Sequence, residues 1–107
     1  KTLQQRVQSV LGDVAHPRVG AALALSEETG EVCDLVLKKE CYGKVVSSEA
    51  LEGELADVLV CVAELANAYG VDLAAACDRK LNDLSQRVPA WKADFGPSLE
   101  AARKRMD

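Results

Sequence analysis

Two short clusters of acidic residues have the spacing of turns of an α-helix. The first contains Glu27, Glu28 and Glu31, and the second contains Glu54 and Asp57. Helical residues three or four positions apart lie on one face, so the carboxylates within each cluster converge. Like charges at this spacing repel each other unless a cation lies between them. The chemistry that these residues could support is therefore the binding of a metal cation through oxygen atoms.

The first cluster taken alone favours a plainer interpretation, a solvated acidic face of a helix. The second cluster changes this balance, because the segment around it is apolar on almost every side, with one stripe formed by Leu51, Leu55, Val58, Val62, Leu65 and Tyr69. Such a helix is buried, and buried carboxylates are costly unless they are paired or bind a metal. If Glu28 and Glu31 face Glu54 and Asp57 across a helix pair, four carboxylates form a site for Mg²⁺ or Mn²⁺ rather than zinc.

The segments that must position these carboxylates all have helical periodicity. The apolar spacing predicts helices over residues 2–11, 17–40, 48–69 and 73–88, and a short tail helix over 98–106. Pro89 is expected to stop the fourth helix, which leaves residues 91–97 irregular. No alternating pattern predicts a strand. The expected architecture is therefore all-α, resembling a four-helix bundle.

Length and composition limit how this bundle can be built. The chain has 107 residues, which fits a single domain over 1–107. Hydrophobic residues make up 49% but aromatic residues only 4%, so the core must consist of Leu, Val and Ala on close-packed helices. These helices carry more apolar surface than one short chain can cover, so we expect a homo-oligomer, either a dimer or a dimer of dimers.

Charge and cysteine content exclude several classes of function. A formal net charge of −4 argues against binding of a nucleic-acid polymer through a basic surface. No apolar run approaches the roughly 20 residues that cross a membrane. The cysteines at positions 33, 41, 61 and 77 have no paired spacing, and His16 is the only histidine, so a zinc site is not expected. We expect buried, reduced thiols in a cytoplasmic protein.

Two further features each have two open interpretations. Lys80, Asp83 and Arg87 follow one edge of the apolar stripe on the fourth predicted helix. Lys80 lies near the centre of that stripe, where it either meets an anion such as a polyphosphate or covers apolar surface with its stem. Gly30 costs about 1 kcal/mol relative to alanine inside a helix. It either permits a close approach of two helices or is simply tolerated.

Together the two acidic motifs resemble those of a known family. The first reads Glu27-Glu28-Thr29-Gly30-Glu31 and the second reads Glu54-Leu55-Ala56-Asp57, which have the forms EExxE and ExxD. Over about residues 19–88 the chain is similar to the MazG-like all-α nucleoside triphosphate pyrophosphatases, which include dimeric dUTPases and dCTP pyrophosphatases. The resemblance implies hydrolysis of a nucleoside triphosphate to the monophosphate and pyrophosphate, in the removal of unwanted nucleotides.

The same resemblance implies roles for individual residues. Glu28, Glu31, Glu54 and Asp57 would be the ligands of Mg²⁺, and Glu27 would be an additional ligand or would position the attacking water and take its proton. On the fourth predicted helix, basic and polar side chains would contact the triphosphate, namely Lys80 and Arg87 with Asn82 or Asp83.

Two other functions compete with this one. A di-iron or di-manganese bundle needs Glu-x-x-His pairs on its core helices, and His16 belongs to no such pair. A non-catalytic helical interaction module that has kept the fold is the stronger alternative. The presence of all five motif carboxylates argues against loss of activity, and a nucleotide assay with Mg²⁺ separates the two.

Overall fold

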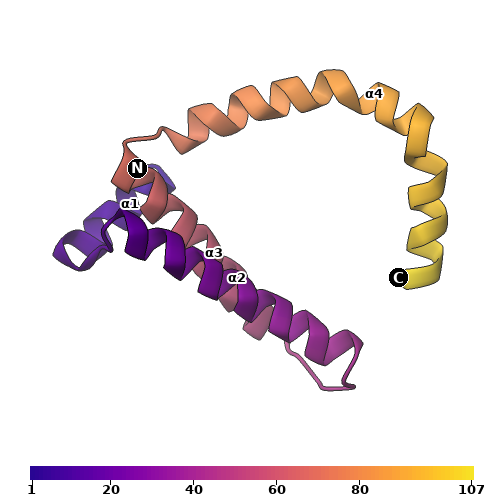
Figure 1. The fold of residues 1–107 in the computed structure, drawn as a ribbon, viewed down its shortest axis with the longest axis horizontal. Helices are drawn as coiled ribbons and strands as arrows, with labels where there is room; N and C mark the ends of the chain where they lie inside the picture. The colour runs from indigo at the N-terminus through magenta and orange to yellow at the C-terminus, as the bar shows by residue number, and fades with distance from the viewer. The chain divides into compact units, whose positions relative to one another are not determined.

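A computed structural model describes all 107 residues, which form helices and no strand. The elements are α1 (Leu3–Leu11), the 3₁₀ turn η1 (Gly12–Val14), α2 (Arg18–Glu40), α3 (Ser48–Tyr69) and α4 (Leu73–Met106) (Figure 1). The all-α prediction is confirmed. The chain divides into two compact units, Lys1–Leu73 and Ala74–Asp107, which are described separately below.

Local sequence fixes the helix ends in the first unit. Thr2 and Gln5 form a reciprocal capping box at the start of α1. The Ser47 hydroxyl accepts a hydrogen bond from the Ala50 backbone N–H at the start of α3. Gly70, with φ of 67°, ends α3 in the left-handed conformation that glycine adopts at low cost. These signals are why the predicted starts and ends of the first three helices agree with the structure within one residue.

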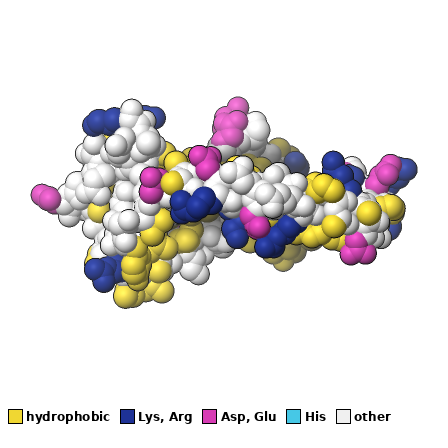
Figure 2. Space-filling view, turned by 90° about the horizontal axis from the view of Figure 1, so that it is seen from above, with side chains coloured by type: hydrophobic (Ala, Val, Ile, Leu, Met, Phe, Trp, Pro, Cys, Tyr) yellow, Lys and Arg dark blue, Asp and Glu magenta, His cyan; other side chains and the backbone are white.

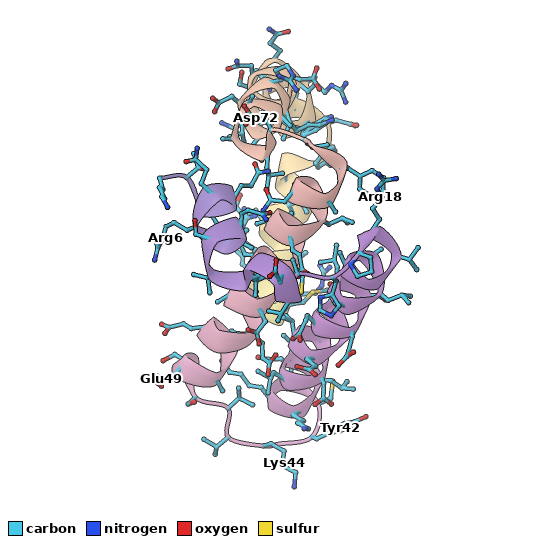
Figure 3. The ribbon with its side chains drawn as sticks, turned by 90° about the vertical axis from the view of Figure 1, so that its left-hand side faces the viewer. Arg6, Arg18, Tyr42, Lys44, Glu49 and Asp72 are labelled. Carbon is cyan, nitrogen blue, oxygen red and sulfur yellow. The ribbon has the colours of Figure 1, made fainter.

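The pairing of α2 with α3 forms the centre of the first unit. Figure 3 shows Arg18 and Asp72 toward one end of this unit and Lys44 and Glu49 at the other, so the two helices are antiparallel. The Arg18 guanidinium lies 5.3 Å from the centre of the Tyr69 ring, a cation–π contact between the start of α2 and the end of α3. The core of the unit is built mainly from small side chains, with Ala21, Ala63 and Ala66 buried.

Helix α1 is fixed to the C-terminal end of α3 by polar contacts around one buried valine, Val7. Gln4 Nε2 donates to Asn67 Oδ1 at 3.1 Å, and Asn67 Nδ2 donates back to the Gln4 carbonyl at 3.0 Å. Gln4 Oε1 also accepts the Leu73 backbone N–H at 2.7 Å. One glutamine therefore joins α1 to the end of α3 and to the residue that follows the turn.

The second unit corrects one prediction. Helix α4 continues through Pro89 and Pro97, so the expected stop at Pro89, the irregular segment over 91–97 and the separate tail helix are wrong. The apolar spacing of three and four residues carries on past Pro89 to Trp91 and Phe95, and both prolines lie off that stripe. Each proline removes one backbone donor and bends the helix without interrupting its apolar face; Figure 1 shows α4 changing direction part-way along.

The cysteines correct a second prediction. All four are free thiols, but only Cys61 is buried, whereas Cys33, Cys41 and Cys77 are exposed. The reason is that many apolar helix faces are uncovered within one chain: Leu23, Leu55 and Leu59 are each more than half exposed. Figure 2 shows hydrophobic patches between charged side chains on the face that it draws. No single helix is both long and apolar enough to cross a membrane, and α3 and α4 meet those criteria only as a joined, bent pair.

Candidate metal centre

The α2–α3 pair brings the two acidic motifs together. Helix α2 supplies Glu27, Glu28 and Glu31, and α3 supplies Glu54 and Asp57. Ligand atoms of Glu27, Glu28 and Glu31 lie within 4.8 Å of one another, and so do those of Glu28, Glu54 and Asp57. Glu28 belongs to both groups and is therefore the residue that joins them. We call these five residues the carboxylate cluster.

No protein cation neutralises this cluster. The ion pairs of the chain involve Glu64, Asp34, Asp83 and Glu100, and none includes a member of the cluster. The Oε2 atoms of Glu28 and Glu54 are buried and have no hydrogen-bond partner. Buried carboxylate oxygens without a partner are costly. An oxygen-only set of ligands with two such atoms fits a hard divalent cation.

Two carboxyl groups of the cluster, those of Glu28 and Glu54, have a raised pKa. Burial is the main cause of the raised pKa of Glu28, and the charges of Glu31 and Asp57 add to it. The pKa of Glu54 is raised first by a hydrogen bond that its protonated form makes with Glu31, and then by burial. When all of these groups are ionised, Glu54 can no longer donate this hydrogen bond. The packing of the two helices then keeps the carboxylates close together despite their mutual repulsion. A bound cation reverses this situation, because it favours the ionised form of every group.

Cys61 lies one turn after Asp57 on α3 and is buried. Burial and the charges of Glu28, Glu64 and Asp57 raise the pKa of the thiol. The protonated form of this thiol is therefore favoured beside the cluster.

Glu64 has a role that sequence reasoning missed. It continues the stripe of Glu54 and Asp57 along α3, but it is bound elsewhere. Its Oε1 accepts the His16 backbone N–H and lies 2.8 Å from His16 Nδ1. The Glu64 side chain is only 6% exposed, whereas that of His16 is 55% exposed. This contact anchors the segment before α2 against α3. A carboxylate within the apolar run of residues 58–66 was the available signal, but nothing in the sequence identifies its partner.

The space around Gly30 decides between its two interpretations. A Cβ atom added there would meet no other atom within 4 Å. A close approach between helices does not explain this glycine, and simple tolerance does.

The remaining predicted site residues, Lys80, Asp83 and Arg87, lie on α4 in the second unit. Arg87 Nη2 and Asp83 Oδ2 form an ion pair of 3.0 Å across one helical turn. Lys80 is exposed. The structure therefore places these three side chains along one helix, and their role toward a substrate stays a prediction.

Comparison with known proteins gives the family. Residues 20–91, about two thirds of the chain, match the model of the MazG nucleotide pyrophosphohydrolase domain. The fold is all-α, and two antiparallel helices supply the carboxylate cluster. The family match shows that the chain belongs to the MazG nucleotide pyrophosphohydrolase domain family. No curated protein and no solved structure matches it.

Proposed function

We propose that the protein is a Mg²⁺-dependent hydrolase that cleaves a nucleoside or deoxynucleoside triphosphate to the monophosphate and pyrophosphate. The observation that carries this proposal is the cluster itself, which has two buried carboxylate oxygens without partners and no ion pair to a protein cation. Glu28, Glu31, Glu54 and Asp57 would hold the metal, and Mn²⁺ has the same ligand preference. When bound, the metal would offset the charge of the phosphates and lower the pKa of a water molecule.

The chain's own residues would divide the remaining work. Glu27 is an exposed member of the cluster, as are Glu31 and Asp57, and Glu27 is the one not assigned as a metal ligand here, so it can accept a proton from the attacking water and pass it to solvent. Lys80 and Arg87 would contact the triphosphate, and the ion pair with Asp83 holds the Arg87 guanidinium in place. Water attack at the α-phosphorus would make pyrophosphate the leaving group.

Other parts of the proposal are supported by features outside the carboxylate cluster. The family match extends across the boundary between the two units, at residues 73 and 74, which supports one functional domain over the whole chain. Four free cysteines support a reducing, cytoplasmic setting. The uncovered apolar faces support a homodimer or homotetramer, and removal of surplus or non-canonical nucleotides is the proposed role.

A nucleotide panel with product identification tests the activity. With Mg²⁺, the purified protein should release nucleoside monophosphate and intact pyrophosphate, with no orthophosphate at early times. In ¹⁸O-labelled water the label should enter the monophosphate. Glu54→Gln and Asp57→Asn should lose the activity, and Glu52→Gln, an exposed neighbour on α3, should keep it. Label in orthophosphate would overturn the assigned bond, and no turnover with any nucleotide would favour the non-catalytic module.

A further inference from the structure

Glu64 is the one charged residue of the chain that is buried. It lies on α3, two helical turns beyond Asp57, and it belongs to neither group of converging ligand atoms in the carboxylate cluster. A buried ion pair is costly, and an apolar side chain of similar size often serves stability as well or better. The best-attested benefit of a buried polar group between helices is that it fixes how the helices align.

The partner of Glu64 is His16, which directly precedes Pro17 and the start of α2. Glu64 Oε1 accepts the His16 backbone N–H and lies 2.8 Å from Nδ1 of the same residue. Pro17, with φ of −65°, connects His16 stiffly to Arg18, the first residue of α2. A shift of His16 relative to Glu64 is therefore also a shift of the first turn of α2 relative to α3.

The other contacts between α2 and α3 hold their alignment along the helix axes less firmly. The buried side chains of the pair include three alanines, Ala21, Ala63 and Ala66. Such small side chains form shallow ridges, which interlock less than large ones do. The Arg18 guanidinium reaches the Tyr69 ring through a long, flexible side chain. At the opposite end of the pair, the connection over residues 41–47 is not helical. The hydrogen-bonded contact at the buried glutamate is therefore the firmest fixed point of the alignment.

The alignment at this contact reaches the carboxylate cluster because both helices are stiff in between. No proline interrupts residues 18–31 of α2 or 54–64 of α3. Glu64 lies about 10 Å along the helix from Asp57, at about 1.5 Å per residue. Sliding one helix by a single residue would thus move Glu28 about 1.5 Å relative to the ligands on α3. Mg²⁺ demands a near-ideal octahedral geometry with short bonds, whereas Ca²⁺ accepts longer bonds in a flexible geometry.

We propose that Glu64 is a positioning residue, which through His16 holds α2 and α3 in the alignment that lets the carboxylate cluster prefer Mg²⁺ to the larger Ca²⁺. This inference rests on the proposed function of the cluster, and it adds a residue that touches neither metal nor substrate. The feature of Glu64 that matters is the acceptor oxygen, because that atom holds the His16 backbone N–H. An amide oxygen in the same place can accept the same hydrogen bond.

Two substitutions with side chains of similar length separate the hydrogen bond from the charge. Glu64→Gln and Glu64→Met both remove one negative charge, but only glutamine keeps an oxygen that accepts the His16 backbone N–H. Calorimetric titration of chelator-treated protein with Mg²⁺ and with Ca²⁺ gives the ratio of the two affinities. Glu64→Gln should keep the wild-type ratio, and Glu64→Met should lower it by about tenfold. A loss of folded protein, or of the charge alone, lowers both affinities together and leaves the ratio unchanged.

His16 supplies the matched test from the other side of the bond. His16→Ala keeps the backbone N–H and should keep the wild-type ratio. His16→Pro removes that donor and should lower the ratio as Glu64→Met does, and the extended conformation of Ala15 accepts a following proline. Either of the two disruptive variants suffices if the other does not fold. A wild-type ratio in both, or the same fall in ratio for Glu64→Gln as for Glu64→Met, would overturn the inference and leave the metal centre standing. A wild type that binds no Mg²⁺ would overturn the metal centre as well.

Discussion

Glu28 of α2 and Glu54 of α3 each hold a buried Oε2 atom that has no hydrogen-bond partner, within one cluster on two antiparallel helices. A ligand atom of Glu28 lies within 4.8 Å of carboxylate oxygens from both acidic motifs. Protonated Glu54 forms a hydrogen bond with Glu31. The helix pair therefore holds its acidic groups in a geometry that costs free energy when the site has no cation. Most of the measurable behaviour of the site follows from this relationship.

Metal affinity should depend on the α3 carboxylates. In calorimetric titration of chelator-treated protein, wild type should bind Mg²⁺ or Mn²⁺. Asp57→Asn and Glu54→Gln should each weaken binding by about tenfold or more, because each removes a charged oxygen ligand. Glu52→Gln lies on the same helix outside the cluster and serves as the control. Wild-type affinity in both cluster variants would refute the site.

Without metal, Glu54→Gln should raise the melting temperature by a few degrees, because it removes one charge from a repulsive group. The pH dependence follows from the raised pKa of Glu28 and of Glu54. Their protonated forms are favoured in the folded state, so their contribution to stability is present at pH values below the ordinary glutamate pKa. It is lost as the pH rises through the higher folded-state values.

Thermal melts of metal-free protein between about pH 4 and pH 8 check both effects. As the pH rises over this range, the variant should lose less stability than the wild type. At neutral pH, Mg²⁺ should raise the melting temperature of the wild type and leave that of the variant unchanged. A lower melting temperature for Glu54→Gln would mean that Glu54 makes a favourable contact within the protein.

In the contact between His16 and Glu64, the hydrogen bond from the His16 backbone N–H should make the main contribution to stability. Glu64→Ala leaves the part-buried His16 backbone N–H without its charged acceptor and should cost about 2–3 kcal/mol. His16→Ala keeps that backbone bond and loses only the imidazole contact of a half-exposed side chain, so about 1 kcal/mol is expected. Urea unfolding of both variants gives the comparison. Equal losses would indicate that the imidazole makes the main contribution.

Two glycine substitutions should have opposite effects. Gly30→Ala adds a methyl group that meets nothing within 4 Å and should stabilise α2 by up to about 1 kcal/mol. Gly70→Ala forces alanine to a φ of 67° and should destabilise the protein by about 1 kcal/mol. Chemical denaturation of metal-free protein measures both. A destabilised Gly30→Ala would reveal a close packing contact at that position.

Local sequence predicted the first unit well because its signals act over a few residues. Thr2, Ser47 and Gly70 fix helix ends through bonds to neighbours at most five positions away. The same logic failed in α4. Pro89 predicts a stop, although the apolar spacing through Trp91 and Phe95 continues the helix. A proline costs one backbone bond and some strain, and an apolar face that must be buried can outweigh that cost.

The sequence by itself determined the helical architecture and the acidic motifs, because helix periodicity and the convergence of residues three apart are properties of a single helix. Only the tertiary structure decided that Glu28 lies beside Glu54 and Asp57, that their oxygens have no partner, and that Glu64 is bound to His16, 48 residues away in the chain. Those relationships depend on how α2 and α3 pack and on which side chains burial leaves without water. Packing of that kind is set by all the contacts between the two helices together, and no short segment encodes it.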